Sequence, residues 1–214
     1  MIELQTSLPA SDPPPTLRVD STVSESSVSD QEKIERIRYH FQEIMATLGL
    51  DLSDDSLSGT PLRVAKMYVN EAFSGLVPGS FPSISVFENT YGYDQMLIER
   101  DIQVYSYCEH HFVPFFGKAH VAYFPSDKVI GLSKLNRIVK YFARRPQVQE
   151  RLTMDIANCL KDVLATDDVA VVIEAKHLCV ASRGVEDTNS TTVTRHLAGK
   201  FLLAEHRDVF SNVR

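Results

Sequence analysis

The sequence contains no run of roughly 18 to 20 consecutive apolar residues, the length that a membrane-spanning helix needs. Its first residues, Met1 to Thr6, include neither the basic segment nor the apolar core of a secretory signal. An excess of positive charge is also lacking: the formal net charge is −6, whereas broad binding to nucleic acid needs a basic surface. We therefore expect a cytoplasmic protein that binds neither membranes nor nucleic acid, and any anionic ligand must meet a local basic cluster.

Cysteine is rare, and the three cysteines form an odd count that does not suit a disulfide framework. In a reducing compartment, such residues are metal ligands, nucleophiles or buried apolar side chains. Cys159 falls on the apolar stripe of a predicted helix over residues 147–165. It is expected in the core, because free cysteine behaves as a small hydrophobic residue. Cys108 and Cys179 remain for chemistry.

The chain length indicates one compact domain with a tail. Residues 1–28 are rich in Ser, Pro, Asp and Thr and cannot bury enough apolar surface to offset their ordering entropy, so we predict a disordered tail. Residues 29–80 are predicted to form an N-terminal helical region. Its first helix begins with a capping box at Ser29 and ends at Gly49.

The second helix of this region is predicted to begin with Thr60 as its cap and Pro61 as its first helical residue. Residues 81–214 form the predicted catalytic domain. Here a helix with Ser133 as its cap is interrupted at Pro146, and a further helix follows over 147–165. Alternating or continuous apolar runs predict strands over residues 98–107, 118–124, 169–175 and 191–201. The predicted order is helices, two strands, two helices and two strands, with no βαβ alternation. This order favours an α+β sheet with helices on one face.

Potential metal ligands occur in two short motifs that each fall where a predicted strand ends, Cys-Glu-His-His from Cys108 to His111 and His-Leu-Cys from His177 to Cys179. A catalytic zinc site takes three protein ligands and keeps one position for water. Cys108, His111 and Cys179 would supply three. In an extended segment, His177 and Cys179 would share one face, because side chains repeat every two residues.

Spacing alone does not decide which of His110, His111 and His177 binds the metal. Imidazoles that do not bind it are suited to moving protons, because histidine titrates near neutral pH. The alternative for each is a buried structural histidine or one that supports a ligand.

Basic residues occur in three separate places: Arg63 with Lys66, Lys134 with Arg137, and Arg183 after the second motif. In an acidic protein this pattern suits a polyphosphate, although each residue alone is equally typical of a solvated surface. Glu150, next to Gln149 at a helix start, suits either the helix dipole or recognition of paired N–H donors on a purine edge.

Several long segments closely resemble GTP cyclohydrolase I. They are CEHHFVPFFGKAH (108–120), VIGLSKLNRIV (129–139), FARRPQVQERLT (142–153), AKHLC (175–179), TPLRVAKMY (60–68) and SRGV (182–185). The resemblance covers about residues 32–205. It implies the tunnelling fold (T-fold), with an antiparallel four-stranded sheet, five subunits closing into a barrel, and two such rings forming a homodecamer whose sites lie between subunits.

The same resemblance assigns site residues. The zinc (Zn2+) ligands fall on Cys108, His111 and Cys179, and the catalytic imidazoles on His110 and His177. Glu150 and Gln149 match positions that anchor guanine. The positions around the ribose and triphosphate are matched by Ser133, Lys134, Arg137, Arg183, Arg63 and Lys66.

The implied reaction is the hydrolytic opening of the imidazole ring of GTP, with release of formate and rearrangement to 7,8-dihydroneopterin triphosphate. It is the first step of pterin synthesis, either folate or tetrahydrobiopterin. By analogy, His177 would protonate or hydrogen-bond the purine N7. The rival readings are a nitrile reductase of the same fold, which needs a cysteine nucleophile and a nicotinamide, and a catalytically silent relative that binds a pterin or a protein partner. A regulatory partner stays open.

Overall fold

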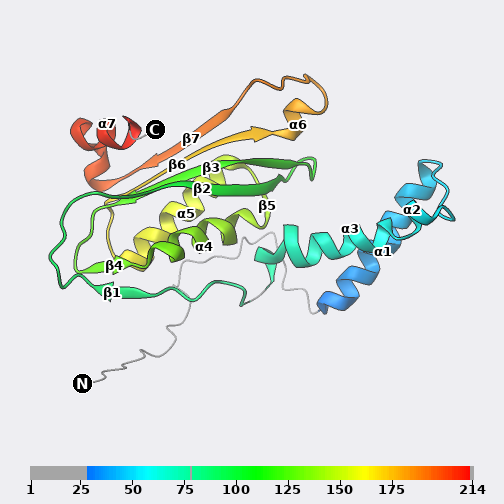
Figure 1. Cartoon of the computed structure of the whole chain (residues 1–214), viewed down its shortest axis with the longest axis horizontal. Helices are drawn as coiled ribbons and strands as arrows, with labels where there is room; N and C mark the ends of the chain where they lie inside the picture. The colour runs from blue at the N-terminus through cyan, green and yellow to red at the C-terminus, as the bar shows by residue number, and fades with distance from the viewer. Residues whose placement is uncertain (1–27, 78, 213–214) are drawn as a thin grey trace.

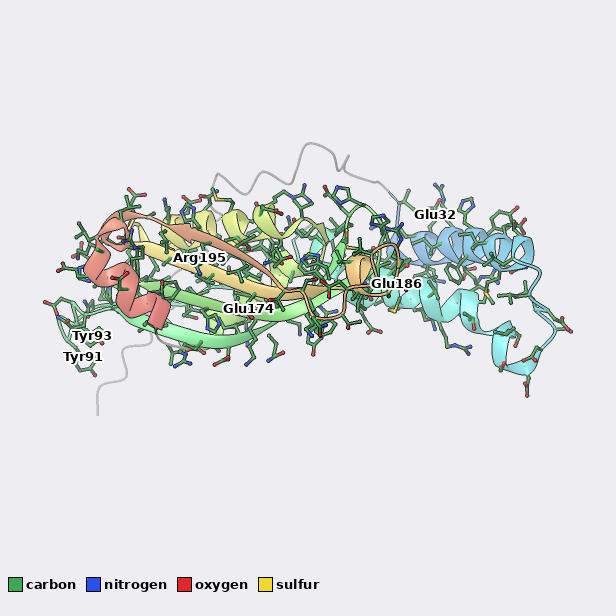
Figure 2. All side chains as sticks on the ribbon, turned by 90° about the horizontal axis from the view of Figure 1, so that it is seen from above. Glu32, Tyr91, Tyr93, Glu174, Glu186 and Arg195 are labelled. Carbon is green, nitrogen blue, oxygen red and sulfur yellow. The ribbon has the colours of Figure 1, made fainter. Side chains whose placement is uncertain are left out.

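The computed structural model describes residues 28–77 and 79–212. The predicted tail over residues 1–28 therefore lies, apart from Val28, outside the described residues. Figure 1 shows helices α1 to α3 extending from one end of a layered body built from a sheet and two long helices. Helix α7 lies at the opposite end of that body, an arrangement that the perpendicular view in Figure 2 repeats.

The N-terminal helices form a small unit of their own. Helix α1 (Asp30–Thr47) begins as predicted, because the Ser29 hydroxyl accepts a hydrogen bond from the Glu32 amide at 3.3 Å. Helices α2 (Asp55–Ser58) and α3 (Thr60–Met67) follow. Buried Ile34, Ala65 and Val69 join α1 to α3 and to the π-helix Tyr68–Ala72 that continues it.

The second predicted helix starts one residue early and changes type. The Gly59 carbonyl accepts from the Arg63 amide at 3.1 Å, so Gly59 and not Thr60 is the N-cap. After the π-helix, a 3-10 turn (Ser74–Leu76) reaches the end predicted near Gly75. The Gly75 amide donates to the Arg144 carbonyl at 2.9 Å, which ties this segment to the body.

The main sheet has the strand order β5-β2-β3-β6-β7. Its four longer strands are antiparallel neighbours: β2 (Leu97–Cys108), β3 (Pro114–Tyr123), β6 (Val169–His177) and β7 (Thr192–Leu197). The expectation of four strands is corrected to five, because β5 (Pro146–Gln147) runs parallel to the end of β2. Strands β1 (Val86–Glu88) and β4 (Lys128–Ile130) form a separate pair.

Strand β3 starts four residues before the predicted position, since Pro114 and Gly117 lie inside it and not in a link. A glycine is required at 117 because a Cβ atom there would lie 2.0 Å from the Glu174 carbonyl oxygen on β6. Close backbone contact between β3 and β6 therefore replaces side-chain packing at this point.

Helices α4 (Leu132–Ala143) and α5 (Gln149–Leu164) pack on one face of the sheet, and their apolar stripes build the main core. The predicted cap at Ser133 is wrong. Gly131 is the N-cap, and its carbonyl accepts from the Lys134 amide at 2.7 Å. Cys159 is confirmed as a core residue with 3% exposure, and burial raises the pKa of its thiol to about 12.

The prediction that helices cover only one face needs a second correction. The strand β7 ends at Leu197, and a 3-10 turn (Gly199–Leu202) and helix α7 (Ala204–Asn212) fold over the far end of the other face. They pack around the second core cluster, which contains Ala122, Phe124, Ala170, Phe201 and Phe210. Beyond this cluster, Glu174 and Arg195, labelled in Figure 2, are exposed on the sheet.

No helix in the described part of the chain is long and apolar enough to cross a membrane.

Candidate active site

The register of the sheet brings both ligand motifs to one end of it. Tyr107 pairs with Pro114 across the β2–β3 ladder, and Phe115 pairs with His177 across the β3–β6 ladder. The loop after Cys108 and the short helix α6 (Leu178–Ala181) after His177 are therefore neighbours.

The metal-ligand cluster consists of Cys108, His111 and Cys179, whose ligand atoms all lie within 4.8 Å of one another. A tight turn shapes the first motif: the Cys108 carbonyl accepts from the Phe112 amide at 2.8 Å, and Phe112 has a positive φ of 54°. The second motif departs from the prediction. Only His177 is extended, whereas Cys179 lies in α6, so the two residues do not share one face of a strand.

The donor set fits a zinc ion. Zinc–sulfur and zinc–nitrogen bonds of about 2.3 and 2.0 Å place tetrahedral ligand atoms about 3.5 to 3.8 Å apart. The Cys108 sulfur lies 4.0 Å from Nδ1 of His111 and 3.7 Å from Nδ1 of His110. Among the described residues, His111 is the histidine that groups with both thiols. Two thiols and one imidazole leave a fourth position for water, as a catalytic zinc requires.

The two thiols of the cluster influence each other's charge. Burial, followed by the neighbouring Cys108 thiol, raises the pKa of Cys179, because two thiolates side by side repel each other. The Arg183 guanidinium acts in the opposite direction and lies 3.1 Å from Nε2 of His111. Arg183, predicted to lie around the ribose and triphosphate, is thus placed next to the metal-ligand cluster.

His177 is held rigidly beside the cluster. Its ring stacks on Phe115 with centroids 4.5 Å apart and planes 10° apart. Its Nε2 atom lies 2.7 Å from Oε1 of Gln149. Burial lowers the pKa of His177, and the charge of the exposed Glu150 at the start of α5 partly opposes this effect. Burial of His177 therefore favours its neutral form.

Two residues near the cluster were not singled out from the sequence. Arg151 on α5 forms an ion pair with Glu109, which lies inside the first ligand motif. Its Nε also donates to Oε1 of Gln147 at 2.9 Å, and the Glu109 amide donates to the Gln147 carbonyl at 3.1 Å. The position of Glu109 between two predicted ligands could have drawn attention to it in the sequence. Its pairing with Arg151 depends on tertiary packing and could not.

The remaining predicted site residues lie elsewhere in the chain. Ser133, Lys134 and Arg137 are in the first half of α4, beside β4, which touches the opposite end of the sheet: the Ile130 amide donates to the Tyr123 hydroxyl. Figure 1 shows this separation. The Lys134 amine donates to the Ser83 carbonyl at 2.8 Å.

In the part of the chain that the structure describes, the two predicted basic site residues of the N-terminal helices, Arg63 and Lys66, form no hydrogen bond or ion pair with the metal-ligand cluster. Arg63 donates to the Ser56 carbonyl and the Thr60 hydroxyl, both at 2.8 Å. Lys66 is exposed on α3. A single chain therefore brings together the metal motifs, His177, Gln149, Glu150 and Arg183. It leaves Ser133, Lys134 and Arg137 at the other end of the sheet.

Fold and site together define an α+β protein with a candidate metal centre of the catalytic kind at one end of an antiparallel sheet. Comparison with known proteins gives the family. Residues 37–213 match the GTP cyclohydrolase I family. The chain belongs to this family of enzymes.

Similar proteins cover most of both sequences. The chain is 59% identical over 174 residues to a GTP cyclohydrolase 1 from Flavobacterium johnsoniae, covering 81% of this chain and 78% of that protein. It is 56% identical over 183 residues to one from Tolumonas auensis, covering 86% and 85%. It is 57% identical over 176 residues to one from Aeromonas salmonicida, covering 82% and 81%.

Proposed function

We propose that this chain converts GTP to 7,8-dihydroneopterin triphosphate and formate, as the first step of pterin synthesis. The observation that carries the proposal is the cluster of Cys108, His111 and Cys179 beside His110 and His177, in a chain that belongs to the family over residues 37–213. The bacterial relatives named GTP cyclohydrolase 1 support GTP as the substrate.

Cys108, His111 and Cys179 are the proposed zinc ligands. A bound zinc ion supplies Lewis acidity and lowers the pKa of water, so that a nucleophile is available near neutral pH. The buried position of Cys108, at 6% exposure, gives this site a rigid side, whereas the exposed His111 leaves it open to substrate.

The two other imidazoles are the proposed proton carriers. His177 faces the purine N7, where a hydrogen bond or a proton makes C8 more electrophilic. His110, exposed in the loop and 3.9 Å from the Glu109 carboxylate, moves protons during the later opening of the ribose and closure of the pterin ring. Neither step requires a redox cofactor.

Recognition of guanine is assigned to Glu150. Its carboxylate is exposed at the first turn of α5, next to the residue that contacts His177. A carboxylate accepts from the two neighbouring N–H groups of guanine, N1–H and the 2-amino group, and adenine offers no such pair. Gln149 was assigned to the same task, and its contacts are considered further below.

The triphosphate site is proposed to be shared between subunits of a decamer. Within one chain, Ser133, Lys134 and Arg137 lie beside β4 at the other end of the sheet, as a site completed by neighbouring copies would require. The Arg63 guanidinium binds Ser56 and Thr60, and Lys66 is exposed on α3. Arg183 belongs to the chain that supplies the metal ligands, since it lies 3.1 Å from His111.

Incubation of the purified protein with GTP tests the proposal, with formate and oxidised, fluorescent neopterin measured as separate products. ATP is the matched control, because it carries the same triphosphate and lacks the donors that Glu150 would recognise. Both products from GTP and neither from ATP are expected. A folded, zinc-loaded protein without turnover would instead support the silent relative.

A further inference from the structure

The side-chain amide of Gln149 is oriented without ambiguity. It is 1% exposed, and its Nε2 atom lies 3.0 Å from the carbonyl oxygens of both Ile173 and Thr192. Carbonyl oxygens only accept hydrogen bonds, so the amide nitrogen and not the oxygen must face them. Exchanging the two amide atoms would place three oxygen atoms against one another.

A chain of hydroxyl groups supports the same orientation. The Thr153 hydroxyl donates its hydrogen to the main-chain carbonyl of Gln149 at 2.9 Å. Toward the Thr194 hydroxyl, 2.7 Å away, it can therefore only accept. The Thr194 oxygen then accepts from Nε2 of Gln149 at 3.1 Å. The two N–H hydrogens of Gln149 are thus shared among three acceptors on β6 and β7.

These contacts leave Oε1 of Gln149 as an acceptor, 2.7 Å from Nε2 of His177. From this geometry we infer that Gln149 is a positioning residue, which keeps a hydrogen on Nε2 of His177 and leaves Nδ1 as the ring nitrogen free of this contact. Stacking on Phe115 fixes the plane of the same ring. Hydrogen bond and stacking together restrict both the rotation and the tautomer of His177.

This inference deepens the proposed function and rests on the role of His177 in it. The ring nitrogen left for chemistry is Nδ1, because Nε2 stays bound to Gln149. Because the amide is fully occupied within the chain, Gln149 acts on guanine chemistry through His177. Glu150, its exposed neighbour, makes the contact with guanine.

Direct observation of hydrogen on His177 tests the tautomer without any turnover. Neutron diffraction, or solid-state 15N NMR of histidine-labelled full-length protein at mildly alkaline pH, distinguishes the two ring nitrogens. Hydrogen on Nε2 is expected, and a neutral ring with hydrogen only on Nδ1 would overturn the inference. Failure of the wild-type protein to turn over GTP would reject the proposed function and leave this result intact.

Kinetics of Gln149→Met separate positioning from substrate binding. We expect kcat to fall at least about tenfold, part of the 10²- to 10⁴-fold that general acid–base catalysis contributes, with the Kd for GTP and the zinc content unchanged. A raised KM with unchanged kcat would contradict the inference. Thr194→Val is the control, since it leaves both carbonyl acceptors of Gln149 in place and should retain kcat. If Gln149→Met does not fold, the position of the hydrogen on His177 in the wild-type protein alone tests the inference.

Discussion

The three cysteines differ in what surrounds each sulfur atom. Cys159 lies among apolar side chains of the main core, and burial raises its pKa to about 12, so it stays a thiol at any physiological pH. Cys108 and Cys179 lie with His111 in the ligand cluster. Chemical reactivity and metal binding are therefore confined to one pair.

Replacing one thiol of this pair tests the ligand assignment. Cys179→Ser should lose zinc and turnover together, each by about 100-fold or more, because removing a ligand costs more than the 10–100-fold typical of residues that support ligands. Zinc content by mass spectrometry and formate release are the two measurements.

Cys159→Ala is the matched control for this experiment. It should bind zinc normally and be less stable, since it leaves a small space in the core. A Cys179→Ser protein that keeps its zinc and its activity would show that another residue completes the site.

Among the secondary-structure elements, the ion pair between Glu109 and Arg151 holds the loop between β2 and β3 (residues 109–113, the metal loop) against α5. Arg151 also donates to Gln147 on β5 at 2.9 Å, so one guanidinium holds two segments. A lysine has no fork of donors and cannot bridge both. Arg151→Lys should therefore weaken zinc binding and turnover by about tenfold, within the range for residues that support a metal site.

Lys161→Arg, also on α5, is the control for Arg151→Lys. Lys161 forms a long surface pair with Asp167 at 3.4 Å, so a change that keeps its charge should alter neither zinc affinity nor turnover. Equal effects of the two substitutions would show that the Glu109 contact has no special role.

Strand β3 lies between β2, which ends at Cys108, and β6, which ends at His177, and Gly117 allows the close approach of β3 to β6. In Gly117→Ala the new Cβ atom would meet the Glu174 carbonyl at 2.0 Å and the Ala175 Cα at 2.6 Å. We expect a loss of at least about 2 kcal/mol in the free energy of unfolding, measured by urea denaturation.

Gly131→Ala provides the comparison for Gly117→Ala. Gly131 has an ordinary φ of −61°, and the nearest atom to a new Cβ lies 3.6 Å away, so this substitution should change stability little. Equal stability of the two variants would mean that the strands separate easily at Gly117.

Much of this arrangement could be predicted from the sequence where the pattern was long. Helices α1, α4 and α5 have sustained apolar periodicity, and β2 and β6 have the alternation or β-branched residues of strands. Helix N-caps were less predictable. The caps are Gly59 and Gly131, which precede the expected Thr60 and Ser133, because the backbone conformation sets where these helices begin and no side-chain cap forms.

Short or tertiary features could not be predicted in this way. Helix α6 has four residues, too few to show a period, so Cys179 was expected on a strand. The metal cluster was predictable because thiols and imidazoles are recognisable ligands at any distance in sequence. The contacts Glu109–Arg151 and Gln149–His177 join separate elements, and only the folded chain reveals them.

At the scale of the whole molecule, aromatic contacts link the N-terminal helices to the metal loop. Tyr68 and Phe73 meet Tyr107 and Phe112 with ring centroids 5.3 to 6.4 Å apart. Lys134 and Arg137 of α4 nevertheless lie at the other end of the sheet from the ligands of their own chain. A neighbouring copy is therefore the proposed source of the remaining substrate contacts.

Complementation between two inactive variants tests the shared site. His110→Ala and Lys134→Ala should each lose most activity. If each site takes His110 from one chain and Lys134 from a neighbouring chain, random mixing of the two variants on co-expression should leave about one quarter of the sites intact. Formate release by the co-purified mixture measures this. A mixture no more active than either variant alone would place both residues in one chain's site.

In the proposed function, a zinc ion held by Cys108, His111 and Cys179 makes GTP ring opening possible. The most direct measurement removes metal with a chelator, confirms that the protein stays folded, and follows formate release from GTP as zinc is returned. Turnover should be absent without metal and rise in proportion to bound zinc, up to one ion per chain. Equal formate release with and without zinc, or none from the fully loaded protein, would contradict the account.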